Sequence, residues 1–182
     1  TRATVQRAQE RADLVAAAPE VPFTLAPQPE TLDGLVDARG AGGAAVASLV
    51  EATGDRPVLG RPYTDVDLEA MQESGLSNEA SEQVDAGAGA VRRLFRREPV
   101  PGIWLSGPTL GSDAANEAVD LGFDRAIVPP SAVETSAVPD APVTLDDGGP
   151  RAMVSDPELA AHLRGDDDVV DAQRFLAELT IM

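Results

Sequence analysis

The chain has 182 residues, of which 43% are hydrophobic and 25% charged, and this composition suits one globular domain with a sizeable core. Its 31 acidic residues outnumber its 14 basic ones, all arginine, and the resulting net charge of −17 disfavours nucleic acid and anionic membrane surfaces as partners. No apolar run is long enough to span a membrane, and the absence of cysteine excludes disulfides, cysteine-ligated zinc and thiol nucleophiles. We expect 1–182 to be a single α/β domain cut from a longer protein, because helical patterns reach both ends without caps.

The predicted elements alternate between helix and strand along the chain. Helices are expected at 4–17, 31–36, 44–52, 66–72, 77–97, 112–121, 157–163 and 169–182. Strands are expected at 21–26, 56–60, 102–105, 125–128 and 151–154, with a hairpin around 143–145. Thr64 or Asp65 is expected to cap the helix at 66–72, and Ser77 the one that follows.

A proline follows each of the five predicted strands. These prolines are Pro27, Pro62, Pro108, Pro129 and Pro157. Proline cannot donate to a sheet ladder but suits the first turn of a helix, so it marks the switch from strand to helix. The alternation predicts a parallel sheet with right-handed crossovers. The expected fold class is therefore α/β, either a partial or irregular (β/α) barrel with parallel strands or an open doubly wound sheet.

Polar side chains follow the predicted strands at the edge where both architectures place their sites. The rim consists of Gln28, Glu30, Arg61, Tyr63, Asp65, Asp67, Trp104, Ser106, Thr109, Asp113, Ser131 and Asp156. The candidate ligand-binding residues are Gln28, Arg61, Tyr63 and Trp104, and the candidate catalytic residues are Glu30, Asp65 and Asp156. This mixture suits a polar ligand such as a glycan. The alternative is structural: the aspartates cap helices, Arg61 packs on Tyr63, and Trp104 belongs to the core.

The stretch Thr-Leu-Asp-Asp-Gly-Gly at 144–149 resembles the TFDDG sequence of polysaccharide deacetylases. In those enzymes one aspartate is a base and the other binds a metal together with a His-x-x-x-His pair. This chain has a single histidine, His162, so the metal site cannot be assembled, and Asp-Asp-Gly-Gly predicts a tight turn. Asp166–Asp168 lack the spacing of a calcium loop and are expected to form a solvated loop. No metal and no cofactor is expected.

Four stretches, at 22–32, 56–67, 121–129 and 171–178, resemble a family of uncharacterised exported actinobacterial proteins. Members of that family have a region similar to the (β/α) barrels of glycoside hydrolases and polysaccharide deacetylases. The resemblance spans most of the chain and implies a barrel-like fold, an extracytoplasmic or cell-envelope location and a role with envelope glycans. It supplies no catalytic residues. A cytoplasmic location stays open, because the absence of cysteine fits both compartments.

The leading hypothesis is a cell-envelope domain that binds a polysaccharide or peptidoglycan and does not deacetylate it. A second hypothesis is an active glycoside hydrolase, with Glu30 paired with Asp65 or Asp156. A third is a non-enzymatic acidic scaffold that docks a basic protein. Contact with a membrane is expected only through further parts of a longer protein. The sequence leaves the oligomeric state open.

Overall fold

The computed structural model describes residues 2–22, 24–100, 102–133, 139, 141–145 and 147–162. Its helices are α1 (Arg2–Ala17), α2 (Pro29–Asp37), α3 (Ala41–Thr53), α4 (Leu68–Glu73), α5 (Ser77–Phe95), α6 (Ser112–Asp120), the short 3-10 helix η1 (Pro130–Ala132) and α7 (Pro157–His162). Its strands are β1 (Ile103–Leu105), β2 (Arg125–Val128), β3 (Val143–Thr144) and β4 (Arg151–Val154). The predicted helix at 169–182, the loop Asp166–Asp168, Asp146 and the side chain of His162 lie outside the described residues.

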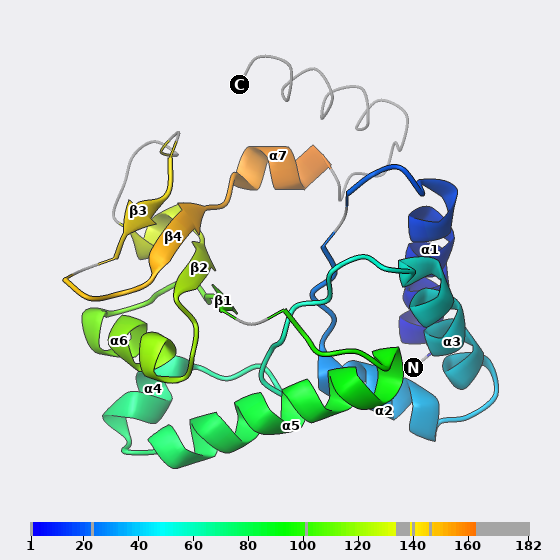
Figure 1. The fold of residues 1–182 in the computed structure, drawn as a ribbon, viewed down its shortest axis with the longest axis horizontal. Helices are drawn as coiled ribbons and strands as arrows, with labels where there is room; N and C mark the ends of the chain where they lie inside the picture. The colour runs from blue at the N-terminus through cyan, green and yellow to red at the C-terminus, as the bar shows by residue number, and fades with distance from the viewer. Residues whose placement is uncertain are drawn as a thin grey trace.

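Two groups of elements are joined by one long helix (Figure 1). Helices α1, α2 and α3 pack together on one side, and the sheet with α4 and α6 lies on the other. Helix α5 has 19 residues and is therefore about 28 Å long. It places Val91 and Phe95 in the first hydrophobic core and Ala80 in the second. No helix of the described part is long and apolar enough to cross a membrane.

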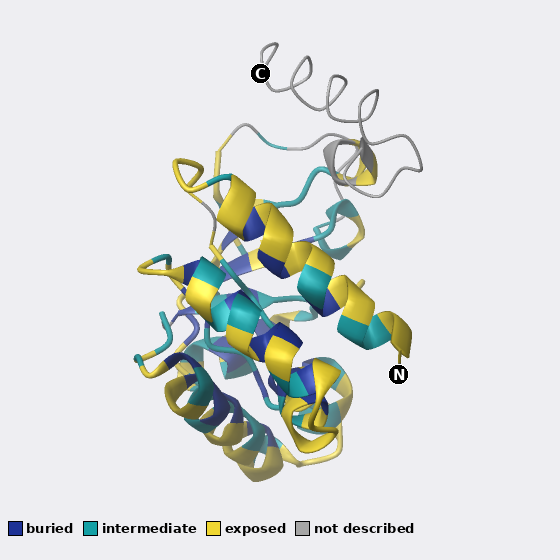
Figure 2. Cartoon of the chain, turned by 90° about the vertical axis from the view of Figure 1, so that its right-hand side faces the viewer, coloured by how far each residue is buried: buried dark blue, intermediate teal, exposed yellow. Residues whose placement is uncertain are grey.

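The first core rests on small side chains at helical spacing. Ala8, Ala12 and Val15 are the buried residues of α1, three or four positions apart, and most of the rest of this helix is exposed (Figure 2). Their small size lets α1 lie directly on α3, which contributes Ala45 to the same core. The Arg56 guanidinium then donates to the Ala18 and Ala52 carbonyls at 2.7 and 2.9 Å, near the C-termini of α1 and α3.

The second core is built on a four-stranded sheet of order β1-β2-β4-β3. Strands β1, β2 and β4 are parallel, and β3 adds an antiparallel edge to β4. The predicted hairpin around 143–145 is therefore confirmed. Its turn is tight, since Leu145 N–H donates to the Pro150 carbonyl at 3.1 Å and Gly148 has a φ of 99°, which favours glycine.

The two predicted strands at 21–26 and 56–60 are wrong as full strands. Leu25 forms a single parallel bridge with Val58, and Leu59 forms one with Val100. Prolines flank both segments and cannot donate to a ladder, so the pairing does not extend beyond these bridges. The order is nevertheless regular, because the five predicted strand segments form four parallel pairs in chain order, with the antiparallel β3 inserted between β2 and β4 in the chain.

The two faces of the sheet differ in what covers them. Helices α4 and α6 supply Leu68, Ala114 and Ala118 to the covered face, where they join the core with four strand residues. Those strand residues are Trp104, Ala126, Val128 and Ala152. On the opposite face the paired neighbours Ile127 and Met153 are 38% and 60% exposed. A parallel sheet with one apolar face open is unusual, since both faces are ordinarily covered.

Candidate functional site

The loop at 61–67 carries three of the predicted site residues, Arg61, Tyr63 and Asp65, and α5 holds this loop in place. The Tyr63 N–H donates to the Gln83 carbonyl at 2.8 Å, and the Glu30 N–H donates to the Tyr63 carbonyl at 3.0 Å. A Cβ at Gly87 would lie 1.8 Å from the Arg61 carbonyl oxygen. Only glycine therefore lets the loop lie this close to the helix.

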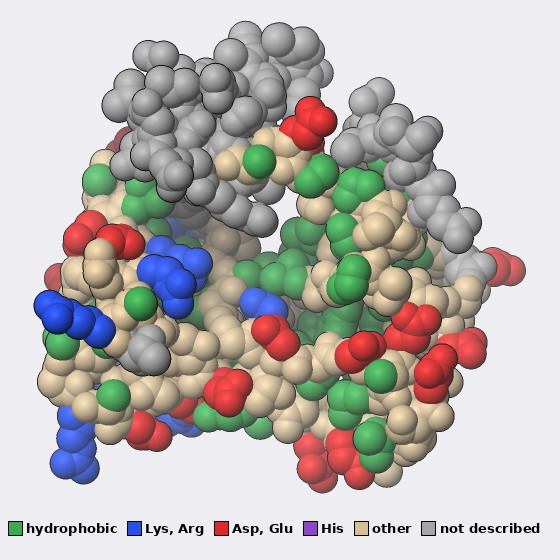
Figure 3. All heavy atoms as spheres, turned by 180° about the vertical axis from the view of Figure 1, so that it is seen from behind, with side chains coloured by type: hydrophobic (Ala, Val, Ile, Leu, Met, Phe, Trp, Pro, Cys, Tyr) green, Lys and Arg blue, Asp and Glu red, His purple; other side chains and the backbone are tan. Residues whose placement is uncertain are grey.

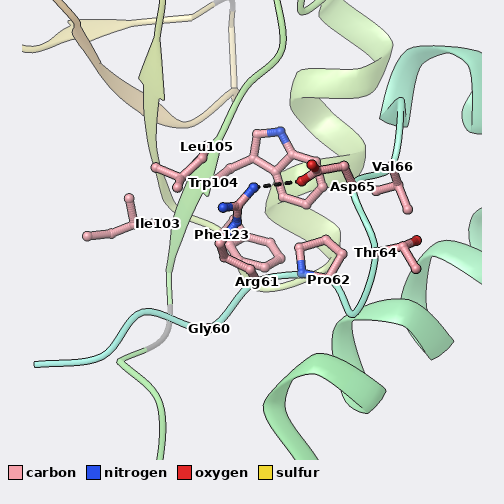
Figure 4. A pocket seen from close by; sticks show the side chains of 10 residues that line it. All are labelled: Gly60, Arg61, Pro62, Thr64, Asp65, Val66, Ile103, Trp104, Leu105 and Phe123. Carbon is pink, nitrogen blue, oxygen red and sulfur yellow. Dashed lines mark hydrogen bonds and ion pairs between the residues drawn. The ribbon is translucent and has the colours of Figure 1, made fainter. Parts of the chain in front are cut away.

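Arg61, Asp65 and Trp104 line one small hollow, which we call the Arg61 hollow (Figure 4). Its lining residues are Gly60, Arg61, Pro62, Thr64, Asp65, Val66, Ile103, Trp104, Leu105 and Phe123. The Arg61 guanidinium pairs with the Asp65 carboxylate at 2.7 Å. The cavity volume is about 20 Å³, which is enough for about one water molecule. Arg61 and Asp65 thus lie together in a space too small for a sugar.

Trp104 is a core residue that also forms a wall of this hollow. It is 4% exposed and packs edge-on against Phe123, with ring centroids 5.1 Å apart and an interplanar angle of 74°. The structure therefore confirms the structural alternative for Trp104 while leaving part of its ring at the hollow.

Tyr63 and Gln28 form contacts that hold the loop at 61–67 in place. The Tyr63 hydroxyl bonds to Asp33, whose carboxylate is held by Arg93 at 2.7 and 2.5 Å. Burial raises the pKa of Tyr63 above its ordinary value of 10.0, and the negative charge of Asp33 and the hydrogen bond to it raise it further. The Gln28 amide donates to the Tyr63 carbonyl at 3.0 Å. The Tyr63 hydroxyl therefore faces Asp33 of α2.

The three candidate catalytic carboxylates do not line a common hollow. Glu30 is exposed in the first turn of α2, and Asp156 accepts a hydrogen bond from the Glu158 N–H at 2.8 Å at the start of α7. Neither belongs to the walls of the hollows described here, whereas Asp65 does. Their catalytic roles stay predictions.

The predicted helix caps near this loop are wrong. Asp67 caps α4 by accepting from the Ala70 N–H at 3.1 Å, because the helix begins at Leu68, two residues later than expected. Neither Thr64 nor Asp65 is in position to do so. The long helix α5 has Leu76 at its N-cap position and no side-chain cap, so Ser77 is its first residue.

A larger groove opens next to the Arg61 hollow, and we call it the Glu69 groove. Its lining residues are Asp65, Val66, Asp67, Leu68, Glu69, Trp104, Ser106, Gly107, Pro108, Thr109 and Leu110. Its cavity volume is about 230 Å³. This lies just below the roughly 300–1,000 Å³ of pockets for drug-sized ligands, so it suits a ligand the size of one sugar ring. An indole wall, two hydroxyls and three carboxylates come together there.

Glu69 is the site residue that the sequence prediction missed. It is half-buried in the first turn of α4, and its Oε1 would lie 2.7 Å from a Cβ at Gly111. Glu69 was missed because the helix was expected to begin at residue 66, whereas α4 begins at Leu68. A start at Leu68 with Asp67 as its cap places Glu69 in the first turn beside the cap, toward the strand-end edge.

A third hollow, which we call the β-edge hollow, continues along the same edge of the sheet with a volume of about 430 Å³. It is lined by Leu105, Ser106, Gly107, Pro108, Ile127, Val128, Pro129, Ser131 and Ser155. The segment 106–108 is the wall that it shares with the Glu69 groove. Seen from behind, hydrophobic side chains surround a central hollow of the molecule (Figure 3). Within the described residues no three carboxylate or histidine side chains meet in an arrangement that could hold a metal ion.

Comparison with known proteins identifies no family. No family model and no curated protein matches the chain. One solved structure, the novel alpha-amylase AmyC from Thermotoga maritima, is similar with a TM-score of 0.45 and 14% sequence identity. The match covers 86% of this chain and 32% of that amylase, so the chain spans about a third of its length. A similarity this low carries no argument about function, and the resemblance to exported actinobacterial proteins stays a prediction.

Proposed function

We propose that the chain is part of a (β/α)-barrel-type domain that binds a saccharide of the cell envelope in the Glu69 groove, and that it binds the saccharide without cleaving it. The observation that carries the proposal is the groove itself. It lies at the carboxyl ends of parallel strands and combines an aromatic wall with a polar rim.

The order of the strands supports the barrel. In a doubly wound sheet the strand order reverses at a switch point, whereas in a barrel each strand pairs with the next one in the chain. The segments at Leu25, Val58, Val100–Leu105, β2 and β4 follow the second pattern. The open apolar face with Ile127 and Met153 also agrees, because this is the face that a complete barrel would turn inward.

The walls of the groove support a sugar as ligand. Sugar rings have apolar faces that pack on aromatic side chains and hydroxyls that bond to carboxylates and hydroxyl groups. The exposed edge of Trp104, with Pro108 and Leu110, offers the first kind of surface, and Asp67, Ser106 and Thr109 offer the second. The acidic walls disfavour phosphorylated or otherwise anionic sugars.

The contacts that Asp65 and Asp67 already make support a binding function over hydrolysis. A glycosidase needs one carboxyl group free to transfer a proton and a second one across the scissile bond. Asp65 is held by Arg61 and Asp67 caps α4, so Glu69 is left without a second free carboxylate among the described walls of the groove. The hydrolase alternative predicts release of reducing sugar, and this release is not expected here.

The single tryptophan of the chain makes the proposal directly testable, because Trp104 lies in the wall of the groove. Titration with soluble oligosaccharides should change its fluorescence in a saturable manner. A pull-down with insoluble peptidoglycan would test the envelope ligand, and a reducing-sugar assay on the same samples would test cleavage. If no saccharide changes the fluorescence and none retains the protein, the proposed function is wrong.

A further inference from the structure

Glu69 differs from the other two carboxylates of the groove in having no partner among the residues that the structure describes. Asp65 is paired with Arg61, and Asp67 accepts from a helix N–H. Among the described residues, no hydrogen bond or ion pair is formed by the Glu69 carboxylate. It is half-buried, so the surrounding protein has removed part of its water. A half-buried carboxylate at the wall of a cavity favours a ligand group that donates hydrogen bonds and carries positive charge.

Gly111 leaves space for this carboxylate. A Cβ at this position would come within 2.7 Å of Glu69 Oε1 and 3.4 Å of its carboxyl carbon, so a larger residue would displace the carboxylate. The backbone of Gly111 is extended, with a φ of −65°, and alanine can adopt it. The substitution Gly111→Ala therefore moves the Glu69 carboxylate without removing its charge and without straining the backbone.

The surroundings of the groove strengthen the preference for a cation. Residues 62–91, which form its α4 side and most of α5, contain seven Asp or Glu residues and no Arg or Lys. The segment 98–124, on its other side, also lacks basic residues. Arg61, the nearest cation in the walls of the adjoining hollow, is paired with Asp65. The field at the groove is therefore negative, and it attracts cationic ligands.

We propose that Glu69 binds the ammonium group of an amino sugar, so that the preferred ligand of the groove is a saccharide with free amines. This inference rests on the proposed function, since it takes the groove to be a saccharide site. The ammonium donates to Glu69, and the sugar ring contacts the apolar wall formed by Pro108, Leu110 and the exposed edge of Trp104. An ammonium group is a stronger donor to a carboxylate than a hydroxyl or an acetamide is.

Three oligomers of the same linkage and length test the inference: a glucosamine oligomer, an N-acetylglucosamine oligomer and a glucose oligomer. Each is titrated against Trp104 fluorescence at mildly acidic pH, where the amine is protonated. The glucosamine oligomer should bind at least about tenfold more tightly than the other two, as a charge-assisted hydrogen bond predicts. Equal binding of all three would overturn the inference and leave the proposed function standing. Binding of none would end the proposed function itself.

Variants separate the role of Glu69 from the general negative charge. Glu69→Gln and Gly111→Ala should each remove the preference, so that the glucosamine oligomer binds no more tightly than the glucose oligomer. The matched control is Glu73→Gln, which removes one exposed charge from the last turn of the same helix, outside the groove. The control should keep the preference. An equal loss in Glu73→Gln and Glu69→Gln would assign the preference to long-range charge and overturn the role of Glu69.

Discussion

The Arg61 hollow and the Glu69 groove share Asp65, Val66 and Trp104 but differ in what their polar groups do. In the Arg61 hollow the charged pair is satisfied internally, and the space of about 20 Å³ holds about one water molecule. In the Glu69 groove the space is about 230 Å³, and Glu69 has no partner among the described residues. A charged residue at the strand-end edge therefore indicates a ligand-binding site only where it is not already paired with another group of the protein.

The largest expected loss of stability follows the removal of Trp104, which lines both the Arg61 hollow and the Glu69 groove. Trp104→Ala removes an indole that is 4% exposed and packs on Phe123, so it should lower the free energy of unfolding by about 3–5 kcal/mol. Chemical denaturation followed by circular dichroism measures it. Met153→Ala, at a position 60% exposed on the open face, should cost less than about 0.5 kcal/mol. Similar losses of stability in Trp104→Ala and Met153→Ala would contradict the conclusion that one face of the sheet is buried and the other is exposed.

The next effect concerns the contact that holds the loop of the Arg61 hollow. Gly87→Ala places a methyl group against the Arg61 carbonyl and should cost about 1–3 kcal/mol of stability. Gly89→Ala, two positions along the same helix with nothing within 4 Å, should instead stabilise by about 0.5–1 kcal/mol. Stability changes of opposite sign in Gly87→Ala and Gly89→Ala would show that close packing against the loop, and not helix propensity, determines the effect at Gly87.

A smaller loss of stability is expected when the Arg61–Asp65 ion pair of the Arg61 hollow is broken. Asp65→Asn breaks the pair with Arg61, but the Asp65 side chain is 79% exposed. Solvent screens such a pair, so the loss of stability should stay below about 1 kcal/mol. Thermal or chemical unfolding measures this loss. A loss well above about 1 kcal/mol would contradict the conclusion that solvent screens this pair.

The mildest test concerns the titration of Tyr63, the single tyrosine of the chain. Burial and Asp33 raise its pKa above 10.0, so ultraviolet titration of the folded protein should give a midpoint above this value. Asp33→Asn should lower the midpoint. The raised pKa favours the neutral phenol in the folded state, so its contribution to stability is present below pH 10 and is lost as the pH rises through the folded pKa. A midpoint at or below 10.0 would place Tyr63 away from Asp33.

Much of the fold could be predicted from the sequence because helical periodicity and proline positions are local signals. The described helices follow the expected ranges, and β1, β2 and β4 form the expected parallel sheet. The strands at 21–26 and 56–60 were overestimated, since the apolar pattern does not reveal how far flanking prolines limit a ladder.

The site could be predicted only as an edge of the sheet. Its residues depend on contacts between distant segments, and such contacts leave no local pattern. Tyr63 bonds to Asp33, thirty residues earlier in the chain, and Glu69 lies against Gly111, more than forty residues later. Two residues of difference in the start of α4 were enough to give the capping role to Asp67 and to hide Glu69.

Chemical-shift mapping of the isotope-labelled protein with the glucosamine oligomer tests the central claim most directly. The account predicts that the largest changes fall on residues 65–69 and 104–110, which line the Glu69 groove. A further hollow at the opposite ends of the strands, lined by residues 19–22, Thr24 and residues 55–57, serves as the internal control. Changes confined to that hollow, or scattered over the surface without saturation, would contradict the account.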